Sequence, residues 1–185
     1  PEHVCSSYDN CHVPWGSTHE KTWHLVKTLP HVSGLFVWTG FDYLGEPTPY
    51  WWPSRSSFFG IVDLAGFPKD VYYMYKSEWT DEPVLHIFPH WNWKEGERVD
   101  IWAYYNNADE VELYLNGKSL GVRQKTDSTY HVSWRVPFTP GTLRAVSRLG
   151  GKEVLVKEIH TAGEPARLVL TPDRSVIQAD GSDLS

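Results

Sequence analysis

The second half of the chain alternates between short strand-like segments and turn residues, and this pattern constrains the fold more than any other feature. Turn residues such as Pro140-Gly141 and Gly150-Gly151 separate the segments. Seven segments favour extended structure: residues 84–88, 98–105, 110–115, 118–125, 130–136, 141–148 and 153–160. Seven short strands with turns every 8–12 residues or so are typical of an immunoglobulin-like β-sandwich.

The pattern of side chains within these segments supports strands. Along residues 98–105, apolar side chains such as Val99 and Ile101 occupy every second position, which is the period of a strand. The dipeptide Asn116-Gly117 stands between apolar residues, which is the strongest short hairpin pattern. No cysteine pair lies in this half of the chain, so the sandwich is not of the antibody type.

The first 83 residues follow a different pattern. The letters STHE at residues 17–20 resemble a capping sequence and predict a helix over residues 18–29. Residues 34–38 form a short continuous apolar run, which predicts a strand buried on both faces, as in a parallel sheet. A long loop rich in Gly, Pro, Ser and aromatic residues follows over residues 39–57. Loops of that length in a compact domain are usually functional.

The end of this first segment predicts a second helix. Residues 58–64 are compatible with another extended piece, Pro68 suits a first helical turn, and residues 70–79 complete the helix. Helix, buried strand, long loop and helix form part of the repeat of a (β/α)₈ barrel, whose loops after the strands carry the active site. A whole barrel needs about 250 residues, so we expect only the end of one here.

A third segment begins near residue 163. Residues 166–172 and 175–178 favour strands and predict the truncated start of a further β-sandwich domain. The predicted domains are therefore residues 1–83, 84–162 and 163–185. Because the chain opens at Pro1 and stops soon after a strand-like segment, we expect both ends to lie within a longer protein.

The charge and the apolar runs exclude several classes of function. The formal net charge is −6 and no basic patch is present, so we expect no nucleic-acid partner. No apolar run approaches the roughly 20 residues of a membrane-spanning helix. Cys5 and Cys11 are interpreted as free thiols, and the spacing of the nearby histidines matches no zinc pattern. We therefore predict no metal site and no cofactor.

Ten Trp and ten Tyr leave two interpretations open, a β-rich core packed with aromatic residues or stacking platforms for sugar rings. Three stretches of the first segment carry a resemblance to a known family. They are CSSYDN at residues 5–10, FVWTGFDYLGEPT at 36–48 and FGIVDLAGFPK at 59–69. Together with VELYLNGK at 111–118, they resemble glycoside hydrolase family 2, notably bacterial β-galactosidases. The resemblance implies the C-terminal end of a catalytic barrel, an accessory immunoglobulin-like domain and the start of another β-domain.

The resemblance implies a retaining exo-glycosidase that hydrolyses terminal non-reducing β-galactosides. Such enzymes use two carboxyl groups, one as acid/base and one as nucleophile. If residues 34–38 are the eighth barrel strand, both catalytic Glu residues lie upstream of Pro1, and Glu2 lacks the context of the nucleophile. We therefore predict no catalytic residue in the chain and no activity of the isolated fragment. The resemblance also allows a homo-oligomer of the full-length enzyme and favours a periplasmic or extracellular bacterial protein.

Four residues are the candidate substrate-binding residues, namely Trp38, Asp42, Glu46 and Trp51. Trp38 ends the predicted strand, where the resemblance places a Trp against the sugar of the first subsite; the alternative is a Trp that closes the barrel mouth. Asp42 and Glu46 would accept hydrogen bonds from sugar hydroxyls or fix the loop backbone. Trp51, with Trp52, would form a platform for the leaving-group sugar or pack on the sandwich.

Trp91 and Trp93 leave two further interpretations open. They pack between the sandwich and the barrel, or they form an aromatic face that binds carbohydrate. The second interpretation belongs to an alternative function for the chain as a whole, that of a non-catalytic carbohydrate-binding or structural accessory module. For the enzyme, the lack of Lys and Arg between Lys27 and Arg55 disfavours glucuronides, because a sugar carboxylate needs cations.

Overall fold

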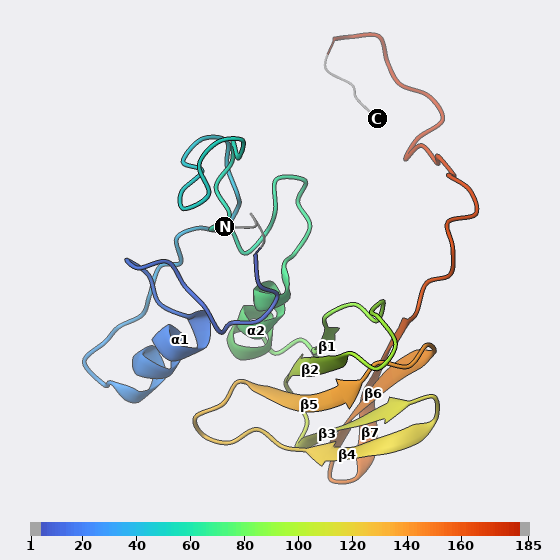
Figure 1. Ribbon diagram of the computed structural model, residues 1–185. Coiled ribbons are helices and arrows are strands. Elements are labelled where there is room, and N and C mark those ends of the chain that lie inside the picture. Colours follow the sequence, from blue (N-terminus) through green and yellow to red (C-terminus); the bar gives the residue numbers. More distant parts are fainter. Residues whose placement is uncertain (1–4, 182–185) are drawn as a thin grey trace.

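The computed structural model describes residues 5–181, so Glu2 lies outside the described residues. A loop-rich segment with two helices is followed by a β-sandwich and then by an extended C-terminal stretch (Figure 1). We refer to residues 5–83 as the first segment. None of the helices in the described part of the chain has the length and apolar character needed to cross a membrane.

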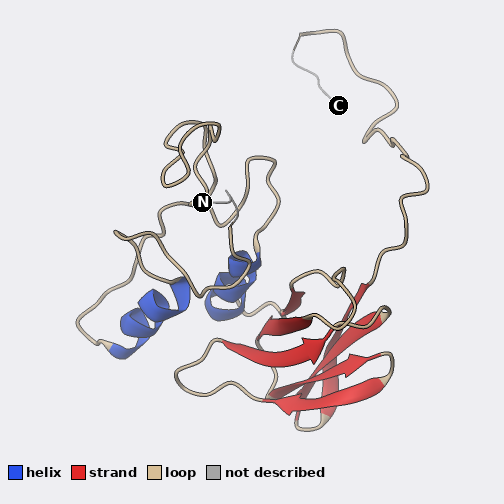
Figure 2. Cartoon of the chain, viewed as in Figure 1, coloured by secondary structure: helices blue, strands red, loops and turns tan. Residues whose placement is uncertain are grey.

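The sandwich consists of two antiparallel sheets, as the strand pattern predicted (Figure 2). One sheet has the order β1-β2-β5 and contains Leu85–Phe88, Arg98–Tyr105 and His131–Pro137. The other has the order β4-β3-β6-β7 and contains Lys118–Arg123, Glu110–Leu115, Thr142–Leu149 and Lys152–His160. All seven predicted strands are confirmed, with ends that differ by a few residues. Two antiparallel sheets that share one core form an immunoglobulin-like sandwich.

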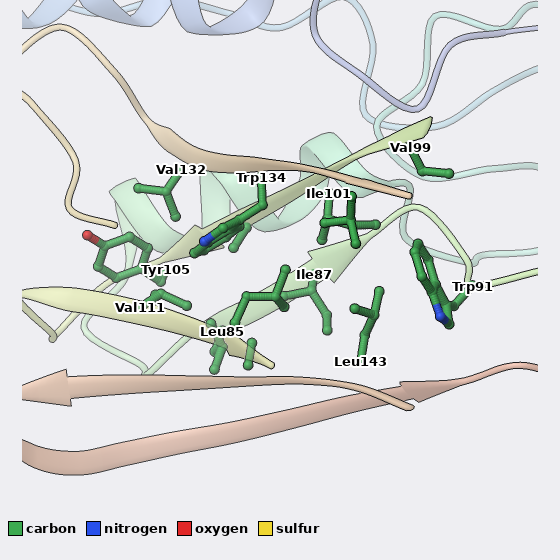
Figure 3. Close-up of a cluster of buried hydrophobic side chains, with 14 of the residues drawn as sticks. Leu85, Ile87, Trp91, Val99, Ile101, Tyr105, Val111, Val132, Trp134 and Leu143 are labelled. Atoms are coloured by element: carbon green, nitrogen blue, oxygen red, sulfur yellow. The ribbon is translucent and has the colours of Figure 1, made fainter. Parts of the chain in front are cut away.

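Strand β2 is packed on both faces. Val99, Ile101 and Ala103 point into the core between the two sheets, together with Trp91 (Figure 3). Trp102 points the opposite way, towards the first segment. The alternation predicted for this strand is therefore confirmed, and each of its faces packs against a different layer.

The predicted Asn116-Gly117 turn joins β3 to β4. Both residues have positive φ, 50° and 80°, which is the requirement of a type I′ hairpin turn. Leu115 pairs with Lys118 across the turn. The Asn116 amide also donates to Pro140 O at 3.0 Å and accepts from Thr142 N at 2.8 Å, so the hairpin is tied to the neighbouring turn.

The first segment contains helices α1, His19–Thr28, and α2, Asp70–Trp79, close to the predicted ranges. The predicted local cap of α1 is wrong, because Thr18 makes no side-chain cap. Instead, the two carboxylate oxygens of Asp9 accept hydrogen bonds from His19 N at 2.8 Å and Glu20 N at 2.7 Å. A negative charge at this position also interacts favourably with the helix dipole. At α2, Pro68 lies before the helix and pairs with Val62.

The predicted strand at residues 34–38 is not present. These residues have no ladder partner in the described chain, and a strand of a parallel sheet forms only when neighbouring strands satisfy its backbone groups. The described residues accordingly contain no closed barrel. A short parallel ladder lies just after this run, where Asp42 N donates to Val62 O and Val62 N donates to Gly40 O.

The first segment packs on the outer face of the β1-β2-β5 sheet. Met74 and Tyr75 of α2 are buried against Phe88, Tyr104 and Tyr130 of the sandwich. Burying one large apolar side chain contributes about 1.5–3 kcal/mol, so this cluster holds the two layers together.

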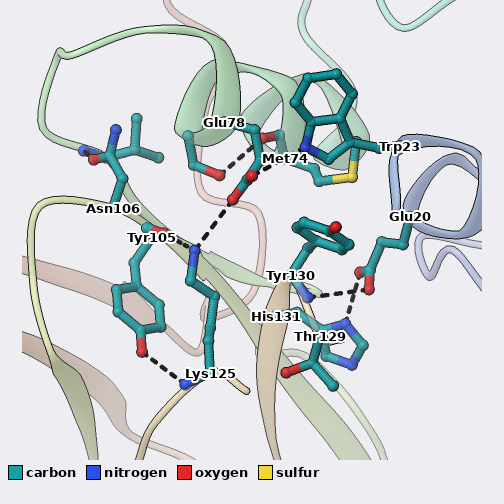
Figure 4. A network of polar contacts seen from close by, with 12 residues as sticks. Glu20, Trp23, Met74, Glu78, Tyr105, Asn106, Lys125, Thr129, Tyr130 and His131 are labelled. Carbon is teal, nitrogen blue, oxygen red and sulfur yellow. Dashed lines mark hydrogen bonds and ion pairs between the residues drawn. The ribbon is translucent and has the colours of Figure 1, made fainter. Parts of the chain in front are cut away.

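Two carboxylates add polar contacts to this interface (Figure 4). Glu78 accepts hydrogen bonds from Trp23 Nε1 at 3.0 Å and Lys27 Nζ at 2.9 Å, and its other oxygen lies 3.3 Å from Lys125 Nζ of the sandwich. The second carboxylate is that of Glu20 in helix α1, whose Oε1 lies 2.6 Å from Nδ1 of His131 in strand β5. The interface thus combines apolar packing with ion pairs that join the two layers.

The C-terminal stretch departs from its prediction. Residues 161–181 contain no helix or strand, so the strands predicted at 166–172 and 175–178 are wrong for the described chain. Leu168 and Leu170 are almost fully exposed. A strand needs a neighbour to bond its backbone, and no described strand pairs with this stretch.

Candidate functional site

An open cavity of about 960 Å³ lies in the first segment. Its wall is formed by the loop of residues 5–19, by residues 35–42 and by residues 58–71, with Tyr50 and Tyr75. The aromatic side chains Phe36, Trp38 and Tyr50 line it. A concave surface with aromatic walls and a few polar groups is the usual form of a small-molecule site.

Trp38 lines this cavity with 75% of its surface exposed, and the neighbouring Phe36 is fully exposed. On one side, Val37 packs against the interface cluster around Met74. On the other, Thr39 N donates to Phe59 O at 3.2 Å, and Thr39 O accepts from Ile61 N at 3.1 Å. The Trp38-Thr39 peptide bond is cis. The backbone is therefore fixed on both sides of an indole that stays open to solvent.

Asp42 also lines the cavity, but its side chain is only 7% exposed. Its Oδ1 accepts from Gly60 N at 2.8 Å and Lys69 Nζ at 2.9 Å, and its Oδ2 lies 2.8 Å from the same ammonium group. Lys69 Nζ further donates to Phe58 O at 3.2 Å. Asp42 therefore joins two parts of the cavity wall. Its partners are Lys69 and Gly60, and no local sequence pattern indicates either residue.

Glu46 and Trp51 do not line the cavity. The Tyr43 hydroxyl donates to the Glu46 carboxylate, and this hydrogen bond raises the pKa of the Tyr43 phenol. Trp51 is exposed in a turn with a φ of 55°. The structure thus brings Trp38 and Asp42 together and leaves Glu46 and Trp51 elsewhere on the loop of residues 39–57.

Two other residues of this loop have contacts that bear on the predictions. Arg55 places its guanidinium 4.8 Å from the ring centre of Trp52, and this cation–π contact holds the two side chains together in that part of the loop. Tyr50 Oη lies 3.4 Å from Cys5 Sγ, and this contact, together with burial, raises the pKa of Tyr50 to about 12. Both cysteines are free and exposed. Because 45 residues separate Cys5 from Tyr50, no local pattern could have indicated this pair.

The carboxylates that line the cavity all have partners in the fold. Besides Asp42, Asp9 caps helix α1, Asp63 Oδ1 accepts from two backbone amides, and Asp70 lies 2.8 Å from His86 Nε2. The described lining residues therefore provide no pair of facing, unengaged carboxyl groups. Residues 5–181 also hold no group of three or more His, Cys, Asp or Glu side chains arranged to bind a metal ion.

Trp91 and Trp93 pack in and against the core of the sandwich. Trp91 is almost fully buried in the core between the sheets, and its Nε1 donates to Thr139 O at 3.1 Å. Trp93 packs against the same core and stacks on His90. Neither the barrel contact nor an open sugar-binding face applies to Trp91. The residues that contact the first segment are Tyr104 and Tyr130 and their neighbours.

Comparison with known proteins gives three kinds of match. A family model described as a domain of unknown function (DUF4982) matches residues 96–155, which lie within the sandwich. The chain is 65% identical over 181 residues to a beta-galactosidase of Bacteroides ovatus, covering 98% of this chain and 21% of that protein. It is 32% identical to a beta-glucuronidase of Formosa agariphila, covering 68% of this chain and 13% of that protein.

Solved structures match over the first segment as well as the sandwich. A beta-glycosidase from Bacteroides vulgatus matches with a TM-score of 0.83 and 38% identity, over 95% of this chain and 22% of that one. A glycosyl hydrolase family 2 member from Bacteroides cellulosilyticus matches with a TM-score of 0.75 and 32% identity, over 89% and 26%. The chain thus spans about a fifth of the length of this Bacteroides ovatus beta-galactosidase and of the Bacteroides vulgatus structure.

Proposed function

Because the chain belongs to glycoside hydrolase family 2, we propose that its first segment forms one wall of the sugar-binding subsite of a retaining exo-glycosidase. The observation that carries this proposal is the exposed Trp38 indole on the wall of the cavity. The C–H face of a sugar ring stacks well on an indole. Trp38 is the sugar-contacting residue, and Asp42 lines the same cavity.

We assign the first segment to the end of a (β/α)₈ catalytic barrel, with both catalytic Glu residues in a part of the protein outside this chain. Exposed apolar side chains support this assignment, because Phe36, Leu44 and Phe67 of the first segment are open to solvent. Apolar surface of this kind usually marks an interface. Neighbouring barrel strands would cover it and would supply the ladder partners that residues 34–38 lack. The isolated chain would then be inactive.

The proposed substrates are terminal β-galactosides. A glucuronide carries a carboxylate, and a site for it needs at least one available cation. Lys69 is the one Lys or Arg among the described lining residues, and it is already paired with Asp42. The chain is more similar to a beta-galactosidase, at 65% identity, than to a putative beta-glucuronidase of Formosa agariphila, at 42%, and this difference also supports a neutral sugar.

The test uses the full-length protein and a panel of nitrophenyl glycosides. We expect hydrolysis of the β-galactoside and not of the β-glucuronide, and no hydrolysis by the isolated chain. Trp38→Ala should lower kcat/KM about 10- to 100-fold, since stacking on an aromatic side chain contributes about 1–3 kcal/mol. Trp15→Ala is the control, because Trp15 is 67% exposed but does not line the cavity. An unchanged kcat/KM for Trp38→Ala would remove Trp38 from the subsite.

The alternative function, a non-catalytic carbohydrate-binding module, has less support. Its aromatic face would have required Trp91 to be exposed, and Trp91 is buried. Polysaccharide binding by the isolated chain would revive this alternative if Trp38→Ala left that binding unchanged.

A further inference from the structure

The Asp42 carboxylate is held in the cavity wall by Gly60 and Lys69. We call the three residues Asp42, Gly60 and Lys69 the Asp42 clasp. Both carboxylate oxygens of Asp42 are engaged, one by the Gly60 amide and both by the Lys69 ammonium group. With only 7% of the side chain exposed, little of the carboxylate is left for a ligand.

The clasp spans the short parallel ladder that fixes the backbone next to Trp38. Residues 39–42 bond to residues 59–62 through four backbone hydrogen bonds of 2.9–3.2 Å. Asp42 stands at the far end of this ladder and reaches back to Gly60 in its middle. A ladder of two short strands is marginal by itself. The clasp supplies a cross-link between its two strands.

Gly60 shows how closely the two strands approach. A Cβ atom at Gly60 would lie 2.1 Å from Asp42 N, 2.4 Å from Phe41 C and 2.5 Å from Val62 O. All three neighbours are backbone atoms, so a side chain cannot be accommodated by a rotamer change. Close contact of the two backbones at Gly60 is what brings its amide within 2.8 Å of the carboxylate.

Lys69 connects this ladder to the rest of the molecule. It is the residue that precedes helix α2, and its backbone amide donates to Ile61 O at 2.9 Å. Helix α2 is in turn packed on the sandwich through Met74 and Tyr75. The chain of contacts therefore runs from the sandwich through α2 and Lys69 to Asp42, and from the ladder to Trp38.

We propose that Lys69 and Asp42 are positioning residues, which hold the Trp38 indole in place by locking the ladder of residues 39–42 and 59–62. This proposal rests on the proposed function of Trp38 as the sugar-contacting residue. It replaces direct sugar binding by Asp42 with an indirect role. It also gives the sandwich a part in the site, because α2 reaches the clasp from the surface of the sandwich.

A double-mutant cycle in the full-length enzyme tests the proposal through kcat/KM on a nitrophenyl β-galactoside. Lys69→Met should lower kcat/KM about 10- to 100-fold, since misplacing a positioning group by about 1 Å can cost that much. Lys69→Arg keeps the cation and should recover activity to within about threefold. In a Trp38→Ala background, Lys69→Met should add less than about twofold, because residues that act through one group are not additive.

Lys76→Met is the matched control. The side chains of Lys76 and Lys69 are each 31% exposed and each is ion-paired, but Lys76 pairs with Glu82, away from the cavity. This variant should leave kcat/KM unchanged. A full effect of Lys69→Met in the Trp38→Ala background would overturn the proposal, and so would an unchanged kcat/KM in the single variant.

A second measurement keeps the two proposals apart. Hydrogen exchange at the amides of residues 59–62 should become at least about tenfold faster in Lys69→Met and in the milder Asp42→Asn. Faster exchange with an unchanged kcat/KM in Trp38→Ala means that the clasp locks the ladder while the proposed role of Trp38 fails. Unchanged exchange in both variants overturns the clasp itself, whatever Trp38 does.

Discussion

At the scale of single residues, Glu78 has three polar side-chain partners where the two layers meet. Its carboxylate is 8% exposed and has partners on helix α1 and on the sandwich (Figure 4). Burial alone would raise the pKa of this carboxyl group. Hydrogen bonds from Trp23 and Lys27 and the charge of Lys125 outweigh burial and lower the pKa. The charged form is therefore the one that stabilises the fold.

We expect Glu78→Gln to lower the free energy of unfolding at pH 7 by about 2 kcal/mol, because Lys27 and Lys125 lose the countercharge of the buried Glu78 carboxylate. A lowered folded-state pKa means that the contribution is present above the unfolded pKa of about 4.3 and is lost as the pH falls through the folded pKa. Wild type should thus lose more stability than the variant between pH 7 and pH 3. Urea unfolding at both pH values measures the difference.

Glu82→Gln is the control for this experiment, because Glu82 is exposed and its ion pair with Lys76 lies on the surface. Surface ion pairs contribute little to stability, so the urea midpoint should stay where it is at pH 7. An equal loss of stability in Glu78→Gln and Glu82→Gln would contradict the prediction that burial makes the Glu78 contacts the stronger ones.

Residue roles were the least predictable part of the site. Trp38 is exposed on the wall of the cavity, and its contact with a sugar stays a prediction. The partners of Asp42 could not be inferred, because Lys69 lies 27 residues further along the chain and meets Asp42 only when the ladder forms. The cap of α1 has the same explanation, since Asp9 acts from ten residues away and the local STHE pattern plays no part.

At the scale of elements, strands with a partner close in sequence were predictable, and strands that need distant partners were not. Strands β2 and β3 have the predicted ends, because alternation and turn residues are local patterns. The apolar run at residues 34–38 has the composition of a buried strand but no neighbour in the described chain. A strand is a property of a pair, so composition alone was not sufficient.

The ladder beside Trp38 gives a prediction at this scale. Gly60→Ala places a methyl group 2.1 Å from Asp42 N and should separate the two short strands. Amides of residues 39–42 and 59–62 should then exchange at least about tenfold faster, whereas those of β2 should not change. Hydrogen exchange read by mass spectrometry on the chain makes this comparison.

Gly40→Ala serves as the matched control, because it lies in the same ladder and a Cβ there would meet open space. It should leave exchange in the ladder as in wild type. If both variants accelerate exchange to the same degree, the close approach at Gly60 is not what matters.

At the scale of the whole molecule, two apolar clusters hold the two sheets and the first segment together as layers. One lies between the sheets of the sandwich, and the other lies between the β1-β2-β5 sheet and the first segment (Figure 3 shows the former). Sequence patterns predicted the first cluster through alternation on β2. They did not predict the second, because Trp102 and Tyr104 look like ordinary solvent-facing positions of a strand until another layer is seen to cover them.

Removing the first segment should therefore expose an aromatic surface. We expect residues 84–162 alone to keep the sandwich core but to bind the dye ANS, because Phe88, Trp102, Tyr104 and Tyr130 lose their cover. Residues 5–162 are the comparison and should bind little ANS at that face. Because exposed side chains of the first segment such as Phe36 and Phe67 can bind the dye themselves, hydroxyl-radical labelling of Trp102, Tyr104 and Tyr130 is compared as well. Equal labelling of these rings in the two proteins would show that the second cluster does not protect them.

The two packed faces of β2 also bear on how such proteins can be recombined in evolution or in the laboratory. An accessory domain joined by a plain linker can be exchanged for any other domain of suitable size. Here, a replacement would have to present aromatic side chains on the outside of one sheet, at the positions that receive α2. A gene fusion that kept only the fold of the sandwich would leave the apolar face of α2 without its packing partner. We therefore expect this helix and this sheet to be exchanged only as a unit.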